Sequence, residues 1–239
     1  MSKNNKFWAI IPARSGSQSV KHKNIINVRG KPLIAYTILS AKKISNVNKV
    51  LVSSDSKNYL KIAKKYGADI LHLRSKKNST NTATDLSFFK EIVKYYKGTN
   101  FDLPKFFLHL RPNCPIRKTK ILNKAISFFL KNNLKYTSVR SVSKMPETSY
   151  KTFEIKNNLL KGLCGQSHNI EKMNKPKEFF KSTYMANGYI DIIKVENICK
   201  NILHGNRSFP FEIKESVVDI DSRNNLLFAK YLLNKKSIN

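Results

Sequence analysis

The amino-acid sequence predicts an α/β fold in which helices flank a mostly parallel sheet. Two observations support this prediction. Short apolar segments alternate with segments of helical periodicity through the first two-thirds of the 239 residues, and 41% of the residues are apolar, enough for a buried core. In such sheets ligands bind at the carboxyl ends of the strands, so the loops that follow strands are the places to look for a site.

The expected strands are short apolar runs. They cover residues 7–11, 49–53, 69–73, 106–110 and 136–142. The expected helices lie between these strands; a proline opens the first helix and Gly67 closes the second. They cover residues 32–43, 57–66, 85–96 and 118–131.

The alternation stops near Ser143. Residues 145–182 have poor periodicity and frequent turn residues, which predicts a small excursion of short strands and loops. We expect this excursion, about residues 143–185, to act as a lid or a dimer contact within a single domain that spans residues 1–239. The sheet is expected to resume at residues 188–193 and 217–220, and a last helix covers residues 224–233.

Composition limits the function classes. The formal charge of +30 fits a polyanionic partner, but the excess is almost all lysine, and the lysines are dispersed. Abundant lysine and asparagine with little glycine are also expected from coding DNA rich in A and T, so we expect no nucleic-acid partner. No run reaches the ~20 apolar residues of a membrane span. With no signal-peptide pattern and three cysteines lacking disulfide or zinc spacing, the sequence predicts a cytoplasmic protein without membrane contact.

The loop after the first strand has the composition of an anion site. It reads IIPARSGSQSVKHKN, from Ile10 to Asn24. Glycine permits a tight turn, serine hydroxyls and backbone N–H groups can line an anion cavity, and arginine and lysine supply cations. The side chain of Asn24 has the donor and acceptor that suit a base edge. The candidate residues are Arg14, Ser15, Gly16, Ser17, Lys21, Lys23 and Asn24; the alternative interpretation is a solvated surface loop.

A pair of carboxylates lies far along the chain. Asp219 and Asp221 flank Ile220, and on a strand residues i and i+2 point to the same face. Two such carboxylates can share a Mg²⁺ ion that also takes phosphate oxygens. The alternative is that Asp221 or Ser222 caps the last helix.

Two further segments follow or precede strands. In LRPNCPIR two prolines stiffen the loop that carries Arg111, Asn113 and Arg117. The loop could hold these three side chains rigidly at the ligand edge of the sheet; the alternative is a stiff connector with solvated arginines. In YMANGYIDII the pair Asn187-Gly188 marks a turn before a strand. The five histidines show no metal-ligand spacing, so each is expected to be structural or solvated.

Taken in order, these segments resemble the acylneuraminate cytidylyltransferase family, whose members make CMP-sialic acid and related CMP-nonulosonates. The resemblance rests on IIPARSGS, KHKN, GKPLIAYTI, VLVSSDS, IAKKYGADI, LRPNCPIR, ANGYIDII and VDIDSRNNLLFA, and it covers essentially the whole chain. It implies a Rossmann-like nucleotidyltransferase fold and a homodimer built partly on the excursion. It also implies that the anomeric hydroxyl of a 2-keto-3-deoxy sugar acid attacks the α-phosphorus of CTP, with Mg²⁺ and release of pyrophosphate.

The resemblance also implies residue roles. Arg14 and Lys23 would hold the triphosphate and, with Asp221, support catalysis, while Asn24 would read cytosine. On the nucleotide side it adds Ser15, Gly16, Ser17 and Arg74. On the sugar side it places Arg111, Asn187, Lys151 and Lys177, whose cations suit a substrate carboxylate. Asp219 and Asp221 would bind the metal.

Three positions depart from the family pattern. Gln18-Ser19 stands where relatives have Lys-Gly, Asn81 where they have a carboxylate, and Arg111 where they have glutamine. The first two leave open a homologue that binds nucleotide without transferring it, and the high charge leaves open a nucleic-acid-binding protein. The third predicts an altered sugar pocket and leaves sialic, legionaminic, pseudaminic and other acids as candidates.

Overall fold

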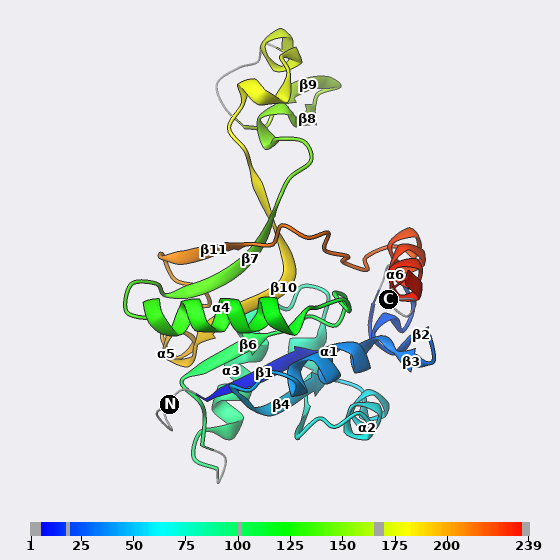
Figure 1. The fold of residues 1–239 in the computed structure, drawn as a ribbon, viewed down its shortest axis with the longest axis vertical. Helices are drawn as coiled ribbons and strands as arrows, with labels where there is room; N and C mark the ends of the chain where they lie inside the picture. The colour runs from blue at the N-terminus through cyan, green and yellow to red at the C-terminus, as the bar shows by residue number, and fades with distance from the viewer. Residues whose placement is uncertain (1–5, 18–19, 100–101, 165–169, 236–239) are drawn as a thin grey trace.

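The computed structural model describes residues 6–17, 20–99, 102–164 and 170–235. Its centre is a seven-stranded sheet in the order β11-β7-β10-β6-β1-β4-β5 (Figure 1). The strands are β1 (Phe7–Pro12), β4 (Val47–Ser54), β5 (Ile70–Leu73), β6 (Phe106–His109), β7 (Ser138–Lys144), β10 (Tyr184–Lys194) and β11 (Ser208–Glu212). All neighbours pair in parallel except β10, which is antiparallel to both β6 and β7. The predicted mostly parallel α/β fold is therefore confirmed.

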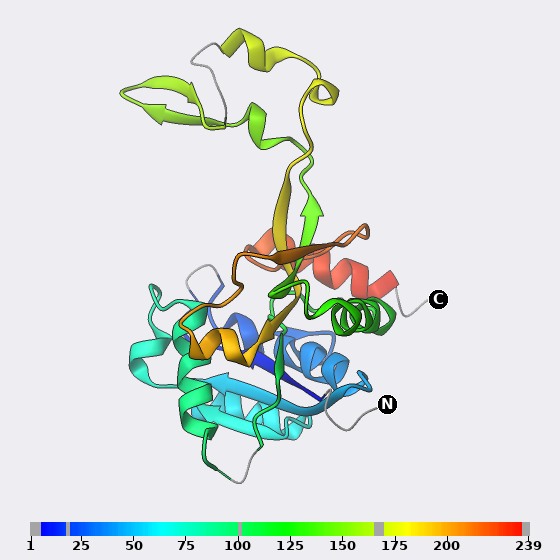
Figure 2. The same ribbon diagram turned by 90° about the vertical axis from the view of Figure 1, so that its left-hand side faces the viewer.

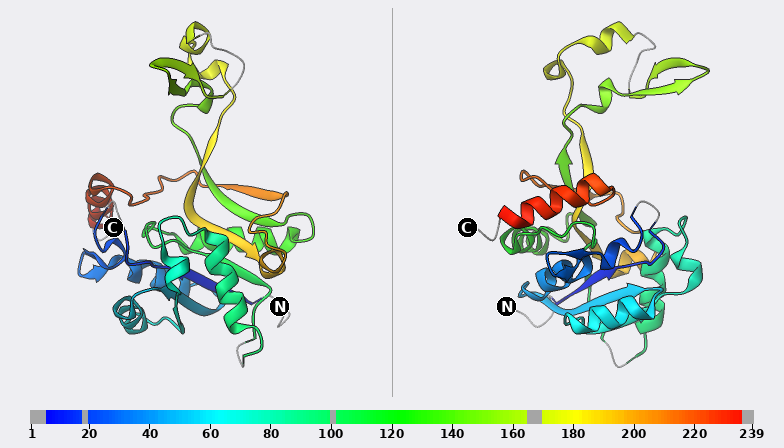
Figure 3. Two further views of the ribbon diagram at one scale, coloured as in Figure 1. Left: turned by 180° about the vertical axis from the view of Figure 1, so that it is seen from behind. Right: turned by 90° about the vertical axis from the view of Figure 1, so that its right-hand side faces the viewer.

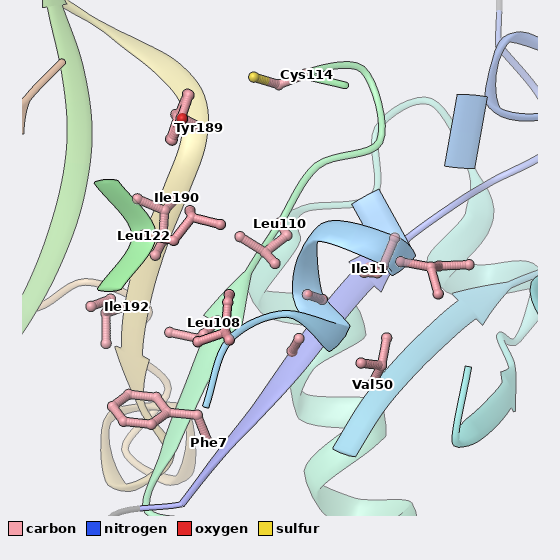
Figure 4. Close-up of a cluster of buried hydrophobic side chains, with 14 of the residues drawn as sticks. Phe7, Ile11, Val50, Leu108, Leu110, Cys114, Leu122, Tyr189, Ile190 and Ile192 are labelled. Carbon is pink, nitrogen blue, oxygen red and sulfur yellow. The ribbon is translucent and has the colours of Figure 1, made fainter. Parts of the chain in front are cut away.

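Helices cover both faces of the sheet, which explains why the central strands are continuous apolar runs. Alternate residues of β1 supply opposite faces: Phe7 and Ile11 join one core cluster, Trp8 and Ile10 the other. The first cluster packs under α1 (Leu33–Lys42), α2 (Lys57–Lys65) and α4 (Thr119–Asn132). Figure 4 shows part of this cluster, including Phe7 and Ile11 of β1 and Leu122 of α4. The second packs under α3 (Asp85–Tyr96) and α5 (Val195–Cys199), on the face seen in the left view of Figure 3.

Two helices of the body start at residues whose side chains cap them. Ser56 and Thr84 precede α2 and α3, and their side-chain oxygens accept hydrogen bonds from the N–H groups of Tyr59 and Ser87. The predicted helices all form, with ends within a few residues of the expected ones.

The prediction of a strand at residues 217–220 is wrong. Val218 and Ile220 are buried in a third cluster between α6 (Arg223–Lys235) and the hairpin of β2 (Asn27–Val28) and β3 (Lys31–Pro32), without a place in the sheet. Their alternation reflects packing against a helix. The sheet instead ends at β11, which pairs with β7 and which the sequence did not predict. β11 has Pro210 at its centre and no fully buried residue, and proline is tolerated in a sheet mainly on an edge strand.

An arm projects from the body between β7 and β10. β7 and β10 extend past the other strands of the sheet (Figures 1 and 2). β10 is longer than expected because its first residues, from Tyr184, pair with the end of β7 in this extension. The arm carries the hairpin of β8 (Phe153–Lys156) and β9 (Leu159–Gly162), turned by Asn157 and Asn158 at positive φ. In the described residues of the arm there are also three short 3-10 helices: η3 (Ser149–Lys151), η4 (Ile170–Asn174) and η5 (Lys177–Phe179).

Among the helices that the structure describes, none combines the length and apolar composition that crossing a membrane requires.

Candidate active site

A cavity of about 260 Å³ opens where β1, β5 and β6 end. This is the edge at which α/β sheets bind ligands. Seven of its lining residues were sequence candidates or departures from the family pattern: Arg14, Lys23, Asn24, Arg74, Asn81, Arg111 and Asn113. The fold thus gathers residues from five separate segments around one hollow.

The first loop is held by a carboxylate that the sequence reading missed. Asp55, just after β4, accepts hydrogen bonds from the Ser15 N–H at 2.8 Å and the Ser15 hydroxyl at 2.7 Å. Ser15 therefore fixes the shape of the loop, and both its backbone N–H and its hydroxyl donate to Asp55. Gly16 and Ser17 are not among the residues that line the cavity, and Gly16 has no positive φ that would require a glycine. Gln18 and Ser19 lie outside the described residues.

Arg14 crosses to the loop after β5. Its Nη1 donates to the carbonyl oxygen of Thr80 at 3.1 Å and to Oδ1 of Asn81 at 2.6 Å. Asn81 thus supplies an acceptor at the position where a carboxylate was expected, but without its charge.

Glu91 of α3 holds the same loop from the other side. Its carboxylate accepts from the Ser75 N–H at 2.8 Å, from Ser75 Oγ and from the amide of Asn78. Burial works to raise the pKa of Glu91, but these hydrogen bonds outweigh it and lower the pKa to about 2. The wall that positions Arg14 is therefore anchored to a helix.

Lys23 and Asn24 bring the first loop to the acidic segment. Lys23 Nζ lies 2.7 Å from Oδ1 of Asp221, which is 198 positions away in sequence. The Asn24 side-chain amide donates to the carbonyl oxygen of Arg14 at 2.9 Å. The acidic segment is itself positioned by the Ile220 N–H, which donates to the carbonyl oxygen of Asn113 at 2.9 Å.

The acidic pair fits a divalent cation. Oδ1 of Asp219 is buried and has no hydrogen-bond partner among the residues that the structure describes. Burial, then the charge of Asp221, raises the pKa of Asp219. Ser222, whose Oγ accepts from the Asn225 N–H at 3.1 Å, caps α6, so capping does not occupy the aspartates. No group of three or more metal-ligating side chains occurs in the described part of the chain. A metal here would take its other ligands from water and phosphate, as Mg²⁺ does.

Arg74 lies deeper in the cavity. Its Nε and Nη2 donate to the hydroxyl and carbonyl oxygens of Ser53, and its guanidinium lies 4.4 Å above the ring of Phe88. Burial lowers the pKa of Arg74 to about 10, so it remains a cation at neutral pH.

Arg111 bridges two carboxylates that the sequence reading also missed. Nη1 donates to Asp191 at 3.0 Å and Nη2 to Asp85 at 2.6 Å. Burial alone would lower the pKa of Arg111, but these carboxylates raise it. Both terminal nitrogens are therefore engaged while the residue lines the cavity.

Arg117 is a structural residue. It is buried and donates to the backbone carbonyl oxygens of Arg111, Gly188 and Tyr189 at 2.7, 3.0 and 2.7 Å. Neither the ligand-facing nor the solvated interpretation of this arginine was right. It ties the proline-stiffened loop to β10.

Known proteins resemble this chain in sequence and in fold. Residues 8–160 match the family described as Cytidylyltransferase. The chain belongs to this family.

Three relatives illustrate its range. An N-acylneuraminate cytidylyltransferase of Escherichia coli O18:K1:H7 is 38% identical over 144 residues, 60% of this chain and 33% of that protein. A CMP-N,N'-diacetyllegionaminic acid synthase of Legionella pneumophila is 31% identical, covering 82% of this chain and 81% of that protein. A pseudaminic acid cytidylyltransferase of Campylobacter jejuni (strain 81-176) is 26% identical, covering 95% and 96%. The match thus spans only a third of the E. coli protein but nearly all of the Campylobacter one.

Solved structures agree on the fold. A CMP:2-keto-3-deoxy-manno-octonic acid synthetase complexed with CTP superposes with a TM-score of 0.65 at 13% identity, covering 97% of this chain and 99% of that one. A 4-diphosphocytidyl-2C-methyl-D-erythritol synthase from Anaerococcus prevotii gives 0.61 at 12% identity, covering 97% and 100%. At these identities the likeness establishes the nucleotidyltransferase fold alone.

Apart from Arg111, the sugar-side candidates of this cytidylyltransferase are not among the residues that line the cavity. The amide of Asn187 donates to Ser143 Oγ at 2.9 Å, and its Oδ1 accepts from the Tyr189 N–H at 3.1 Å. Lys151 Nζ donates to the carbonyl oxygen of Lys175 within the arm. Lys177 lines a second cavity, of about 580 Å³, at the base of the arm.

Proposed function

We propose that this cytidylyltransferase transfers the CMP group from CTP to the anomeric hydroxyl of a 2-keto-3-deoxy sugar acid of the nonulosonate class. The main support for this proposal is the contact between Lys23 and Asp221. Lys23 lines the cavity and can bind phosphate, and the contact brings the acidic pair next to it. The names of the relatives, which act on N-acylneuraminic, legionaminic and pseudaminic acids, support the substrate class.

In this reaction the hydroxyl oxygen forms a bond to the α-phosphorus, and the bond from that phosphorus to the pyrophosphate oxygen breaks. The hydroxyl proton leaves to solvent. Such displacement depends mostly on positioning and on offsetting phosphate charge. Arg14 and Lys23 supply the cations at the cavity wall, and Arg74 adds a third below them. Asn24 would meet the cytosine edge with the part of its amide that does not hold Arg14.

We further propose that Asp219 and Asp221 hold Mg²⁺. This assignment is supported by the buried Oδ1 of Asp219, to which no described residue donates a hydrogen bond. When bound, such an ion offsets the charge on the phosphate oxygens. The chain's own contribution is to keep both carboxylates beside Lys23 through the backbone contact of Ile220 with Asn113.

The arm supports a homodimer. Its hairpin and 3-10 segments expose large apolar side chains, among them Ile155 at 78%, Leu159 at 64% and Phe179 at 74%. Exposed apolar surface of this kind fits burial against a second copy. Because Lys151 and Lys177 lie on the arm, we propose that they meet the sugar carboxylate in the partner's site. The three free cysteines agree with a cytoplasmic enzyme.

The test is a pyrophosphate-release screen. The purified protein is mixed with Mg²⁺, each nucleoside triphosphate in turn and a panel of sialic, legionaminic and pseudaminic acids plus an eight-carbon 2-keto-3-deoxy acid. We expect release with CTP and at least one nonulosonate, and its loss in Asp221→Ala and Lys23→Ala with unchanged circular dichroism. CTP binding without turnover across the panel would point to a non-catalytic homologue, and full activity of both variants would refute the site.

A further inference from the structure

The ammonium group of Lys23 occupies a cation position at the acidic pair. Nζ lies 2.7 Å from Asp221 Oδ1, and the Lys23 side chain is only 12% exposed while that of Asp221 is 62% exposed. Lys23 also lines the cavity in which the phosphates would lie. The Lys23 ammonium therefore lies next to the proposed metal ligand Asp221 and also next to the cavity proposed for the triphosphate.

The contact is not needed to hold either segment. The turn around Lys23 closes on itself, since the N–H groups of Lys23 and Ile25 donate to the carbonyl oxygens of Val20 and His22. The acidic segment is held independently, by Ile220 on Asn113 and by the Asn225 amide, which donates to the carbonyl oxygen of Asp219 at 2.8 Å. An ion pair with one well-exposed partner adds little stability. Its effect must then lie in what it does to other charges.

We propose that Lys23 is a resident cation that competes with the divalent metal for Asp221 and yields it when the triphosphate arrives. The inference rests on the proposed function, because it assigns the ammonium to triphosphate in the occupied site. In the free enzyme the ammonium offsets the charge of Asp221 and repels a divalent ion. When CTP binds, Lys23 Nζ exchanges a carboxylate oxygen for a phosphate oxygen, and Asp221 becomes available.

The exchange is physically simple. Lysine is a point charge on a flexible four-carbon stem, so Nζ can move between two oxygens without moving the backbone. Because linkage is reciprocal, a triphosphate that removes the ammonium from Asp221 raises metal affinity, and the metal raises triphosphate affinity by the same factor. The site would then admit metal together with CTP, with little metal bound beforehand.

The test measures Mn²⁺ binding, by electron paramagnetic resonance, to the full chain with and without CTP. We expect Lys23→Gln to bind Mn²⁺ alone at least about tenfold more tightly than the natural protein, since a unit charge beside the ion is removed. CTP should then raise Mn²⁺ affinity by a smaller factor in Lys23→Gln than in the natural protein. Lys23→Arg keeps the charge and should keep the weak metal-only binding.

Lys42→Gln is the matched control. It removes the same charge from another lysine–carboxylate pair, Lys42–Asp69 at 3.0 Å, and should leave Mn²⁺ affinity unchanged. Lys23→Met serves as a second neutral variant if Lys23→Gln folds poorly. Unchanged or weaker Mn²⁺ binding in a folded neutral variant overturns the inference. Absence of CTP binding to the natural protein instead refutes the proposed function, and the metal-only comparison still decides the competition.

Discussion

Arg14 is oriented by an uncharged acceptor. Asn81 stands where the resemblance to the family predicted a carboxylate, yet its Oδ1 accepts from Arg14 Nη1 at 2.6 Å, as a carboxylate oxygen could. The difference is electrostatic: a carboxylate would offset the guanidinium charge, whereas the amide leaves that charge directed at an anionic ligand. This departure therefore keeps the geometry of the site and changes its potential.

Replacing Asn81 by alanine should weaken CTP binding without unfolding the protein. Asn81 is exposed, so stability should change by less than about 0.5 kcal/mol. The loss of the Asn81 acceptor of Arg14 should raise the KM for CTP by roughly three- to tenfold, which corresponds to about 1 kcal/mol, the net effect of one typical hydrogen bond. Steady-state kinetics with varied CTP would check this. Thr82→Ala, one exposed position away, is the control, and an equal KM change there would contradict a specific role for Asn81.

Sequence reading found the cations of the site more readily than the carboxylates that position them. Arg14, Lys23, Arg74 and Arg111 stood in loops after apolar strands, and the structure places all four around one cavity. The two carboxylates that hold Arg111, Asp85 and Asp191, lie 26 and 80 positions away from it in sequence. Local spacing contains no information about such pairing, which only the folded chain creates.

At the scale of elements, β6, β7 and β10 are joined by a buried charge cluster. Asp191 of β10 is 1% exposed and lies near His109 of β6, Arg140 of β7 and Arg111. Burial works to raise the pKa of Asp191, but the imidazole of His109 and then the charges of Arg111 and Arg140 lower it to about 2. Asp85, the other carboxylate of the cluster, also has a lowered pKa, against the effect of its burial.

Asp191→Asn should destabilise the fold in a pH-dependent way. Because the folded pKa is below the ordinary 3.8, the ionised carboxylate stabilises the fold above about pH 4 and loses this effect as pH falls toward 2. We expect a loss of about 3 kcal/mol at pH 7, typical of breaking a buried pair. The difference from the natural protein should shrink between pH 4 and 2.

Urea unfolding at a series of pH values measures both effects. Glu215→Gln, which breaks an exposed pair with Lys118, is the control and should change stability by less than about 1 kcal/mol. A loss in Asp191→Asn that stays constant down to pH 2 would contradict the electrostatic explanation.

The turn that leads to β11 depends on a glycine for two reasons. Gly205 has φ +74°, and a Cβ there would lie 2.7 Å from Thr137 Oγ1 and 2.8 Å from Thr137 Cβ. Gly30 has φ +75° with open space around it. Gly30→Ala should cost about 1 kcal/mol for backbone conformation alone, and Gly205→Ala roughly 2 kcal/mol more from the clash. Thermal unfolding of the two variants would check this, and equal losses would show that Thr137 yields freely.

The elements predicted from sequence were those whose pattern and burial agree. Buried parallel strands such as β1 are continuous apolar runs, and α2 and α3 have caps and helical spacing. Residues 217–220 misled the prediction because alternation there comes from packing on α6. β11 was missed because an edge strand containing Pro210 has neither a full apolar face nor an unbroken set of donors.

At the scale of the whole molecule, the body and the arm differ in how they bury apolar surface. The body has clusters on both faces of its sheet, whereas all four residues of β8 are exposed. An isolated two-stranded hairpin is marginally stable in water, so the arm needs another surface to pack against. In the proposed dimer, a second copy supplies it.

Replacing Ile155 and Leu159 by serine should therefore convert a dimer to a monomer. Both side chains are mostly exposed in one chain, so the substitutions should leave the fold of the body unchanged, while an interface would lose its apolar anchors. Sedimentation at micromolar concentration would give the mass. The control is Leu134→Ser, which alters an even more exposed leucine, at 91%, beyond the end of α4 on the body.

The KM for the sugar acid then shows whether the interface only holds two copies together or also contributes residues to the sugar site. Since the cavity proposed to bind the nucleotide is formed within one chain, the monomeric variant should keep its affinity for CTP. If Lys151 and Lys177 reach the partner's sugar site, the same variant should show a KM for the sugar acid raised at least about tenfold, the effect of losing charged contacts to a carboxylate. A monomer with an unchanged KM for the sugar acid would leave these lysines without a role in binding. A natural protein that is itself monomeric would refute the proposed homodimer.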